Sequence, residues 1–186
     1  MKKIFFLFVF LLLITGCSVK KATELTDAEK FANEYSVSEK NQFKYVNIDE
    51  TIDIIKNGTG IIFFGNSDCE WCVASAQILT DVLKNEKSLK IYYYNPKMIQ
   101  DKNTKKYKQL ITLLKDYLET DKEDNSYLFL PDIYFVKNGR IIGHNNDLAT
   151  MNGTIEKSLT EKRKKQIKNK YKKLIDETIK ECTNNC

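Results

Sequence analysis

The stretch "GIIFFGNSDCEWCVASAQILTDVL", residues 60–83, joins an apolar run to two cysteines and then to an amphipathic segment. The run at 60–65 is apolar without alternation, which is typical of a buried strand covered on both faces of a sheet. After the cysteines, apolar residues recur at helical spacing as far as Leu83, which predicts a helix. The stretch therefore predicts a buried strand, a loop that carries Cys69 and Cys72, and a helix, in that order.

The N-terminal residues have the pattern of an export signal. Two lysines precede an apolar run at 4–14, which is too short to span a bilayer comfortably as a helix. The segment "LITGC", residues 13–17, resembles the lipobox at which bacterial lipoproteins are cleaved and lipidated. We therefore expect residues 1–16 to be a lipoprotein signal peptide and Cys17 to be the lipidated first residue of the mature protein. A plain signal peptide or an uncleaved anchor, with Cys17 as an ordinary thiol, is the alternative.

The rest of the chain is long enough for one domain with a sizeable core but hardly for two. We expect a lipid-anchored leader with a short helix at 17–39 and a single domain at 40–186. The formal net charge is +5, and almost all cations are lysines. Their densest run, residues 161–173, lies on a helical pattern with its own apolar stripe, so a solvated helix face is favoured over contact with anionic lipid. This distribution predicts no nucleic-acid partner.

Periodicity and turn residues predict alternating strands and helices along the domain. A capping-box pattern at 26–29 starts the leader helix, and Asn138 with Gly139 suits the turn of a hairpin. The expected elements, in chain order, are a helix at 27–35, a strand at 43–47, a helix at 48–57, the strand at 60–65, the helix after the cysteines, a strand at 89–95, a helix within 95–127, hairpin strands at 131–136 and 140–144, and a long helix at 154–180.

The expected order within the domain is β-α-β-α-β-α-β-β-α, with a CxxC at the start of the second helix. This order, with a proline opening the penultimate strand, resembles the thioredoxin family over residues 40–181. The motifs that carry the resemblance are "CEWC" at 69–72 and "LPDIYFVKNGRIIG" at 130–143. The chain is also similar to membrane-tethered thioredoxin-like lipoproteins, including those called bacteriocin transport accessory proteins.

The resemblance implies an α/β, thioredoxin-like fold, with a central mixed sheet of four to five strands flanked by helices and an extended C-terminal helix. It implies that the Leu130–Pro131 bond is cis and faces the cysteines, and that Leu130 offers backbone hydrogen bonds to an extended substrate. An ordinary strand-initiating proline is the alternative for Pro131. Trp71 would flank the site and contact the substrate, or else cap the helix end as a surface residue.

The two cysteines suit disulfide exchange, which needs a thiolate that attacks and a second thiol that resolves the mixed disulfide. A helix N-terminus favours negative charge on Cys69, so Cys69 is the expected nucleophile. Cys72, three residues along in the first helical turn, can bridge back to Cys69 and is the expected resolving residue.

Two features depart from the family pattern. Phe63 stands where many thioredoxins carry a buried acid, so that route for proton transfer is absent. Asp68 and Glu70 flank Cys69 and oppose its ionisation by like-charge repulsion, against the helix dipole. We therefore expect Cys69 to be less acidic than in strongly oxidising members of the family. Glu70 serves either as a proton acceptor for Cys72 or only as a solvated acid at a helix start.

The second cysteine pair, Cys182 and Cys186, allows a structural disulfide, a second redox pair or half of a four-cysteine zinc site. The terminal helix is expected to carry this pair on the order of 40 Å from the CxxC, which disfavours electron relay and zinc binding and favours the disulfide. His144, the only histidine, is expected to be a polar strand-end residue without a role.

Together these patterns predict a thiol–disulfide oxidoreductase, lipid-anchored on the extracytoplasmic face of a bacterial cell membrane. It would act on thiols and disulfides of exported proteins with no cofactor beyond its own Cys69–Cys72 disulfide and with no metal. An unidentified electron-transfer partner in the membrane would set the direction. The alternatives are a non-catalytic thioredoxin-fold accessory or chaperone lipoprotein with a static disulfide, and a metal-binding lipoprotein.

Overall fold

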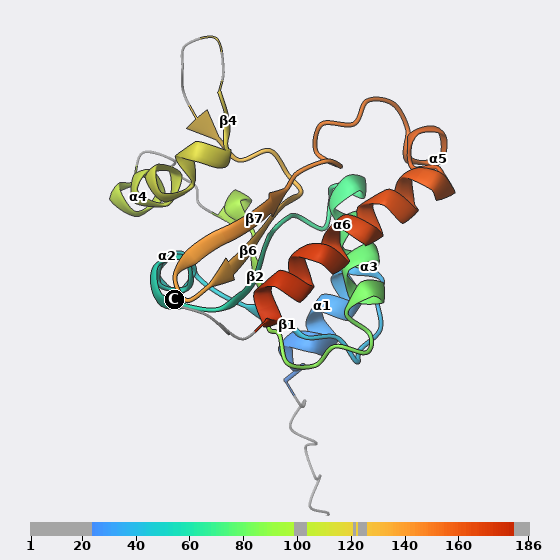
Figure 1. Cartoon of the computed structure of the whole chain (residues 1–186), viewed down its shortest axis with the longest axis horizontal. Coiled ribbons are helices and arrows are strands. Elements are labelled where there is room, and N and C mark those ends of the chain that lie inside the picture. The colour runs from blue at the N-terminus through green and yellow to red at the C-terminus, as the bar shows by residue number, and fades with distance from the viewer. Residues whose placement is uncertain (1–23, 99–103, 121, 123–125, 181–186) are drawn as a thin grey trace, which may run out of the picture.

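The computed structural model describes residues 24–98, 104–120, 122 and 126–180. Within these residues, five strands form one mixed sheet in the order β1-β3-β2-β6-β7 (Figure 1). The first three strands run parallel to one another, and β6 and β7 form an antiparallel hairpin beside β2. The strands are β1 (Phe43–Tyr45), β2 (Gly60–Phe64), β3 (Ile91–Tyr94), β6 (Asp132–Lys137) and β7 (Arg140–Asn145).

Helices cover both faces of the sheet (Figure 1). One face packs against α1 (Asp27–Tyr35), α3 (Glu70–Val82) and α6 (Glu161–Ile179), and the other against α2 (Ile48–Asn57) and α4 (Lys105–Leu114). The predicted fold class is confirmed, because a five-stranded mixed sheet is flanked by helices and followed by a long C-terminal helix. This arrangement is consistent with a thioredoxin-like fold.

The strand β2 joins the two halves of the core. All of its residues are buried, as the uninterrupted apolar run predicts. Because successive side chains of a strand point to opposite faces, Ile61 and Phe63 enter the core under α1, α3 and α6. Ile62 and Phe64 enter the core under α2 and α4. The predicted central strand covered on both faces is therefore confirmed.

Local capping sequences set the starts of the first two helices. Thr26 caps α1 in a full capping box with Glu29, and Asn47 caps α2 in the same way with Glu50. Both helices have the predicted bounds. The strand expected at 43–47 is shorter, because Asn47 has already become the cap of α2.

The predicted hairpin turn is confirmed, since Asn138 and Gly139 have φ angles of 49° and 71°. The backbone N–H of Gly139 donates a hydrogen bond to the carbonyl oxygen of Gly58, at 2.8 Å. This contact brings the hairpin turn against the backbone at the end of α2, where Lys56 lies.

The prediction of one long helix over 154–180 is wrong in one respect, because this segment forms two helices. A short helix, α5 (Ile155–Ser158), precedes α6. Thr160 separates them because it has extended backbone angles and its hydroxyl accepts a hydrogen bond from the N–H of Arg163, which caps α6.

The segment between α4 and β6 contains a small hairpin that the sequence did not predict. A short 3₁₀ turn, η2 (Lys115–Tyr117), follows α4 and precedes this hairpin. Another 3₁₀ turn, η1 (Pro96–Met98), lies earlier in the chain, directly after β3. Its strands, β4 (Glu119–Thr120) and β5 (Ser126–Tyr127), pair antiparallel. Such short strands have too little hydrophobic alternation to be recognised from sequence.

The direction of α6 agrees with the expectation that the chain runs away from the cysteines. The side chain of Lys137, at the far end of β6, donates to backbone carbonyls of Glu177 and Lys180 at the end of α6. At 19 residues, α6 is about 28 Å long, shorter than expected. The disulfide predicted between Cys182 and Cys186 lies outside the described residues and stays a prediction.

The hairpin turn generates a prediction about stability. A Cβ atom at Gly139 would collide with the backbone carbonyl of Lys56, and the left-handed φ disfavours any side chain. We expect Gly139→Ala to lower the free energy of unfolding by about 3 kcal/mol, measured by urea denaturation.

Gly153→Ala is the matched control. Gly153 also has a left-handed φ, of 91°, but its Cβ would meet only the hydroxyl of Ser158. We expect this variant to lose about 1 kcal/mol. Equal losses in the two variants would contradict a specific role for the contact between the turn and α2.

Candidate functional site

The two cysteines lie where β2 leaves the sheet and α3 begins. Cys69 is the cap of α3, and its sulfur accepts a hydrogen bond from the backbone N–H of Cys72 at 3.2 Å. The N–H of Cys69 donates to the carbonyl oxygen of buried Asn66 at 3.0 Å, which fixes the loop. Cys69 is partly exposed and Cys72 is fully buried, and both thiols are free. Solvent therefore reaches Cys69, while Cys72 is shielded from it.

The two thiols differ in pKa because their surroundings differ. The pKa of Cys69 is lowered to about 6, mainly by the hydrogen bond with the side chain of Cys72. The backbone N–H groups of Cys72 and Trp71 and the charge of Lys97 also lower it, while burial opposes the effect. The hydrogen bond to Cys69 and burial raise the pKa of Cys72. At neutral pH the exposed sulfur is therefore a thiolate and the buried one a thiol. A pKa of about 6 agrees with the expectation that Cys69 is less acidic than the strongest oxidants of this type, at about 3.5.

Lys97 is a site residue that the sequence did not predict. It lies on η1, after β3, and its ammonium is 3.7 Å from the carboxylate of Asp68. Both side chains are exposed, so the pair is weak, but Lys97 offsets the charge of Asp68 beside the thiolate. The expected repulsion from Asp68 is therefore reduced by a cation that the sheet brings from another element.

The Leu130–Pro131 peptide bond is cis, as the resemblance implied. In the register of β2 and β6, Phe64 lies opposite Asp132, so Pro131 lies at the end of the sheet from which the chain leads to Cys69. Leu130 and Trp71 are partly buried against the core cluster that also contacts Cys69. The structure thus brings the predicted substrate-binding residues to the same end of the molecule as the cysteines, and their contact with a substrate stays a prediction.

A buried acid and the histidine form a second polar cluster that the sequence did not predict. The carboxylate of Asp132 is 1 % exposed and lies 2.5 Å from Nε2 of His144. The hydroxyl of Tyr134 donates to its other oxygen at 2.9 Å. Burial raises the pKa of Asp132, and these two partners oppose that effect. His144 lies near the end of β7, as expected of a polar strand-end residue, and the structure adds the side-chain partner Asp132.

The sequence signal for this cluster was Asp132, an acid directly before the apolar run at 133–136, because an acid needs a partner when it is buried. Which residue supplies that partner depends on the strand register, which places His144 opposite Tyr134. Asp132 and Tyr134 share the face of β6 that lies under α2 and α4. Cys72 packs in the core of the other face with Phe63, so Asp132 does not replace the acid that is absent at Phe63.

The described part of the chain contains no group of three or more His, Cys, Asp or Glu side chains placed to bind a metal ion. In the same residues, no helix is both long and apolar enough to cross a membrane.

One family model matches the chain. Residues 1–18 match a prokaryotic membrane lipoprotein lipid attachment site, and the matched segment contains Cys17. Comparison with curated proteins gives no match. The attachment site supports association with a membrane through a covalently bound lipid, as the sequence predicts.

The acidity of Cys69 generates a prediction. With a pKa of about 6, the rate at which iodoacetamide alkylates Cys69 should rise with pH through a midpoint near this value and level off above about pH 7. Lys97→Ala should move the midpoint upward by a few tenths of a pH unit, because it removes a nearby cation. Lys108→Ala, on α4, is the control and should leave the midpoint unchanged. A midpoint above about pH 8 in the unaltered protein would contradict the assignment.

The second cluster generates a prediction about stability. His144→Ala leaves the buried carboxylate of Asp132 with Tyr134 as its remaining side-chain partner. We expect a loss of about 3 kcal/mol in the free energy of unfolding at pH 7.

The control is the double variant Asp132→Asn/His144→Gln, which keeps two hydrogen-bonding groups but removes the buried charge. We expect this variant to lose about 1 kcal/mol in urea denaturation. A double variant that is as unstable as His144→Ala would show that the buried charge is not what makes His144 necessary.

Proposed function

We propose that this lipid-anchored protein is a thiol–disulfide oxidoreductase that acts on exported proteins at the extracytoplasmic face of a bacterial membrane. The observation that carries the proposal is the difference between its two thiols. Cys69 is partly exposed, has a lowered pKa and caps a helix, while Cys72 is buried and has a raised pKa. Disulfide exchange requires this division between an attacking thiolate and a resolving thiol.

The first step is attack by the Cys69 thiolate on one sulfur of a substrate disulfide. A bond forms between Sγ of Cys69 and that sulfur, and the other substrate sulfur leaves with the electron pair and takes up a proton. The hydrogen bond from the N–H of Cys72 holds Sγ of Cys69 at the helix end before the attack. The product is a mixed disulfide between the protein and its substrate.

The second step releases the substrate. Cys72 loses its proton and attacks Sγ of Cys69, and the second substrate sulfur leaves with the electron pair. The Cys69–Cys72 disulfide forms, so the substrate gains two electrons and the dithiol supplies them. The raised pKa of Cys72 keeps it protonated until Cys69 has lost its negative charge in the mixed disulfide. The same two steps in reverse would oxidise a substrate dithiol.

Apolar surface lies beside the cysteines for an extended polypeptide. Leu130 precedes the cis proline, and Trp71 lies in the first turn of α3. Phe129, 38 % exposed, lies next to Tyr127, with the ring centroids 5.3 Å apart and the rings tilted by 46°. We propose that Leu130 and Trp71 contact the substrate and that the backbone of Leu130 forms hydrogen bonds with the extended substrate chain. Turnover then requires a membrane partner that supplies or removes two electrons.

Cysteine variants test the mechanism. Cys69→Ser should lower the rate of reduction of a model peptide disulfide by about 1000-fold or more, since the nucleophile is removed. Cys72→Ser should instead accumulate mixed disulfides, identified by mass spectrometry, because the second step is blocked. Cys182→Ser/Cys186→Ser is the control and should keep full activity. Full activity in Cys69→Ser would refute the proposal.

The reduction potential of the Cys69–Cys72 pair distinguishes the direction of the reaction. Equilibration in graded thiol buffers, read by alkylation and mass, should give a value between about −270 mV, typical of a reductase, and about −120 mV, typical of an oxidant. A pair that stays oxidised throughout would favour the accessory or chaperone lipoprotein instead.

A further inference from the structure

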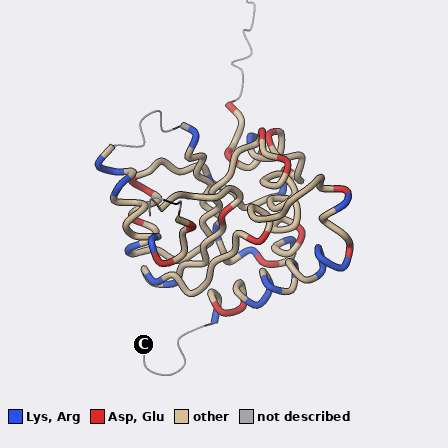
Figure 2. The backbone as a smooth tube through the Cα atoms, turned by 90° about the horizontal axis from the view of Figure 1, so that it is seen from above, with Lys and Arg blue, Asp and Glu red and all other residues tan. Residues whose placement is uncertain are grey.

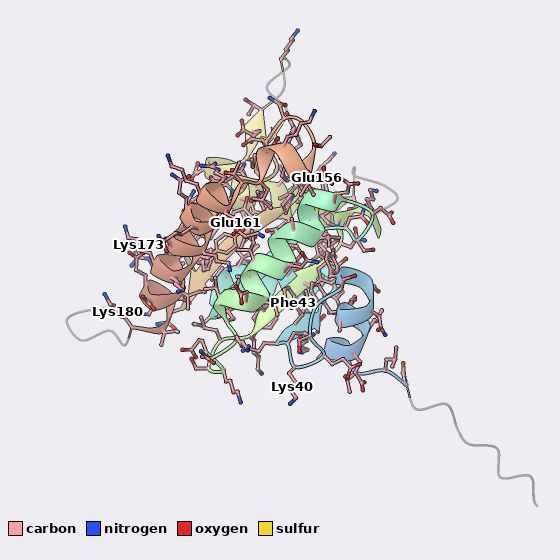
Figure 3. All side chains as sticks on the ribbon, turned by 90° about the vertical axis from the view of Figure 1, so that its right-hand side faces the viewer. Lys40, Phe43, Glu156, Glu161, Lys173 and Lys180 are labelled. Carbon is pink, nitrogen blue, oxygen red and sulfur yellow. The ribbon has the colours of Figure 1, made fainter. Side chains whose placement is uncertain are left out.

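The layer formed by α1, α3 and α6 carries two adjoining hollows on its outer surface. The three helices lie side by side over the sheet (Figure 3). One hollow, of about 340 Å³, lies between α3, α5 and α6, and the other, of about 520 Å³, lies between α3 and the segment that follows α1. Gln77 and Asp81 line both, so the two hollows adjoin across α3, and together they are called the depression below.

Lysines surround this depression. Lys40, Lys84 and Lys87 line the larger hollow, Lys164 and Lys168 line the smaller one, and Asp81 is the one acid in the lining of both. Lys40 lies at the lower end of the layer in Figure 3.

The charge of Asp81 is already neutralised. The ammonium of Lys168 binds its carboxylate, and Lys168, Lys84 and Lys172 together lower the pKa of Asp81. Lys164 is likewise paired with Glu161, at 3.2 Å, so the excess of positive charge on this surface comes from Lys40, Lys84, Lys87 and Lys172.

The arrangement along α6 explains how its lysines reach the depression. Lysines recur along this helix, which follows the lower edge of the molecule in Figure 2 and carries several blue segments. Lys164, Lys168 and Lys172 are spaced four residues apart, so they form one ridge on the side of α6 that faces Asp81. Together with Lys40, Lys84 and Lys87 they define the basic helical surface, which collects cations from three separate parts of the chain.

The lipid attachment site places a bilayer within reach of this surface. Cys17 lies in the segment that matches the attachment site, and α1, which begins at Asp27, belongs to the same helical layer. The chain from Cys17 to Glu24, the first described residue, spans at most about 25 Å when fully extended. A tether of this length keeps the domain at a high effective concentration next to the bilayer, so weak attraction suffices to orient it.

We propose that the basic helical surface docks on anionic phospholipid headgroups of the bilayer to which Cys17 is attached. A lysine-rich surface close to an anionic bilayer is attracted to it, and the attraction falls with salt. In this orientation α3 lies along the membrane, and Cys69 at its N-terminus is held near the bilayer surface. The docking does not depend on the redox activity proposed above.

Chemical labelling of the lipidated full-length protein in vesicles tests the proposal. A membrane-impermeant acylating reagent labels exposed lysines, and mass spectrometry gives the rate at each one. In vesicles with about 30 % phosphatidylglycerol, the six lysines of the surface should be labelled about five-fold more slowly than in pure phosphatidylcholine vesicles. Lys105, Lys108 and Lys115, exposed on the opposite side, should be labelled equally in both. About 0.5 M NaCl should remove the protection.

Matched charge variants make the test specific. Lys84→Glu/Lys168→Glu/Lys172→Glu should abolish the protection at Lys40, Lys87 and Lys164. Lys105→Glu/Lys108→Glu/Lys115→Glu has the same net charge and should retain it, with circular dichroism confirming that both variants fold.

Three outcomes would overturn the docking. Equal labelling rates in the two kinds of vesicle would exclude contact with anionic lipid. Protection that is equally strong in phosphatidylcholine would assign the surface to a protein contact, such as a second copy. Loss of protection in both triple variants would reduce the effect to net charge. None of these outcomes bears on the activity of Cys69, which the cysteine variants test separately.

Discussion

The complete burial of β2 is the constraint on which the rest of the structure depends. Its side chains alternate between two cores, so helices must cover both faces of the sheet. The strand ends at Phe64, and the next residues carry the chain out of the sheet to Cys69 at the start of α3. The position of Cys69 is therefore set by the packing of a strand in which all residues are buried.

The sheet keeps two polar sites apart although both lie at the same end. Cys72 packs among the side chains under α1, α3 and α6, while the pair of Asp132 and His144 lies under α2 and α4. Because Asp132 faces away from Cys72, the thiols are tuned by hydrogen bonds at the helix end and by Lys97 rather than by a buried acid. Asp132 and His144 instead anchor the strand that follows the cis Leu130–Pro131 bond.

The lipid attachment site and the proposed chemistry belong to one arrangement. A covalently bound lipid at the N-terminus keeps the folded domain close to a bilayer, and the proposed docking of the basic helical surface would add an orientation. With α3 along the bilayer, the partly exposed Cys69 would meet polypeptides near the membrane. The proposed electron partner would lie in that same membrane. Docking through one surface would then bring the cysteines close to this partner and to the substrate polypeptides.

Features that depend on neighbours in the chain could be predicted from the amino-acid sequence alone. Apolar runs, capping boxes and the Asn138–Gly139 turn predicted most elements, and the attachment site and CxxC are linear motifs. Three contacts depend on the tertiary structure: Lys97 offsets Asp68, His144 meets Asp132, and Lys84, which follows α3, gathers with lysines of α6 around Asp81. These contacts join residues on different elements, and strand register and helix packing fix which of many charged side chains meet.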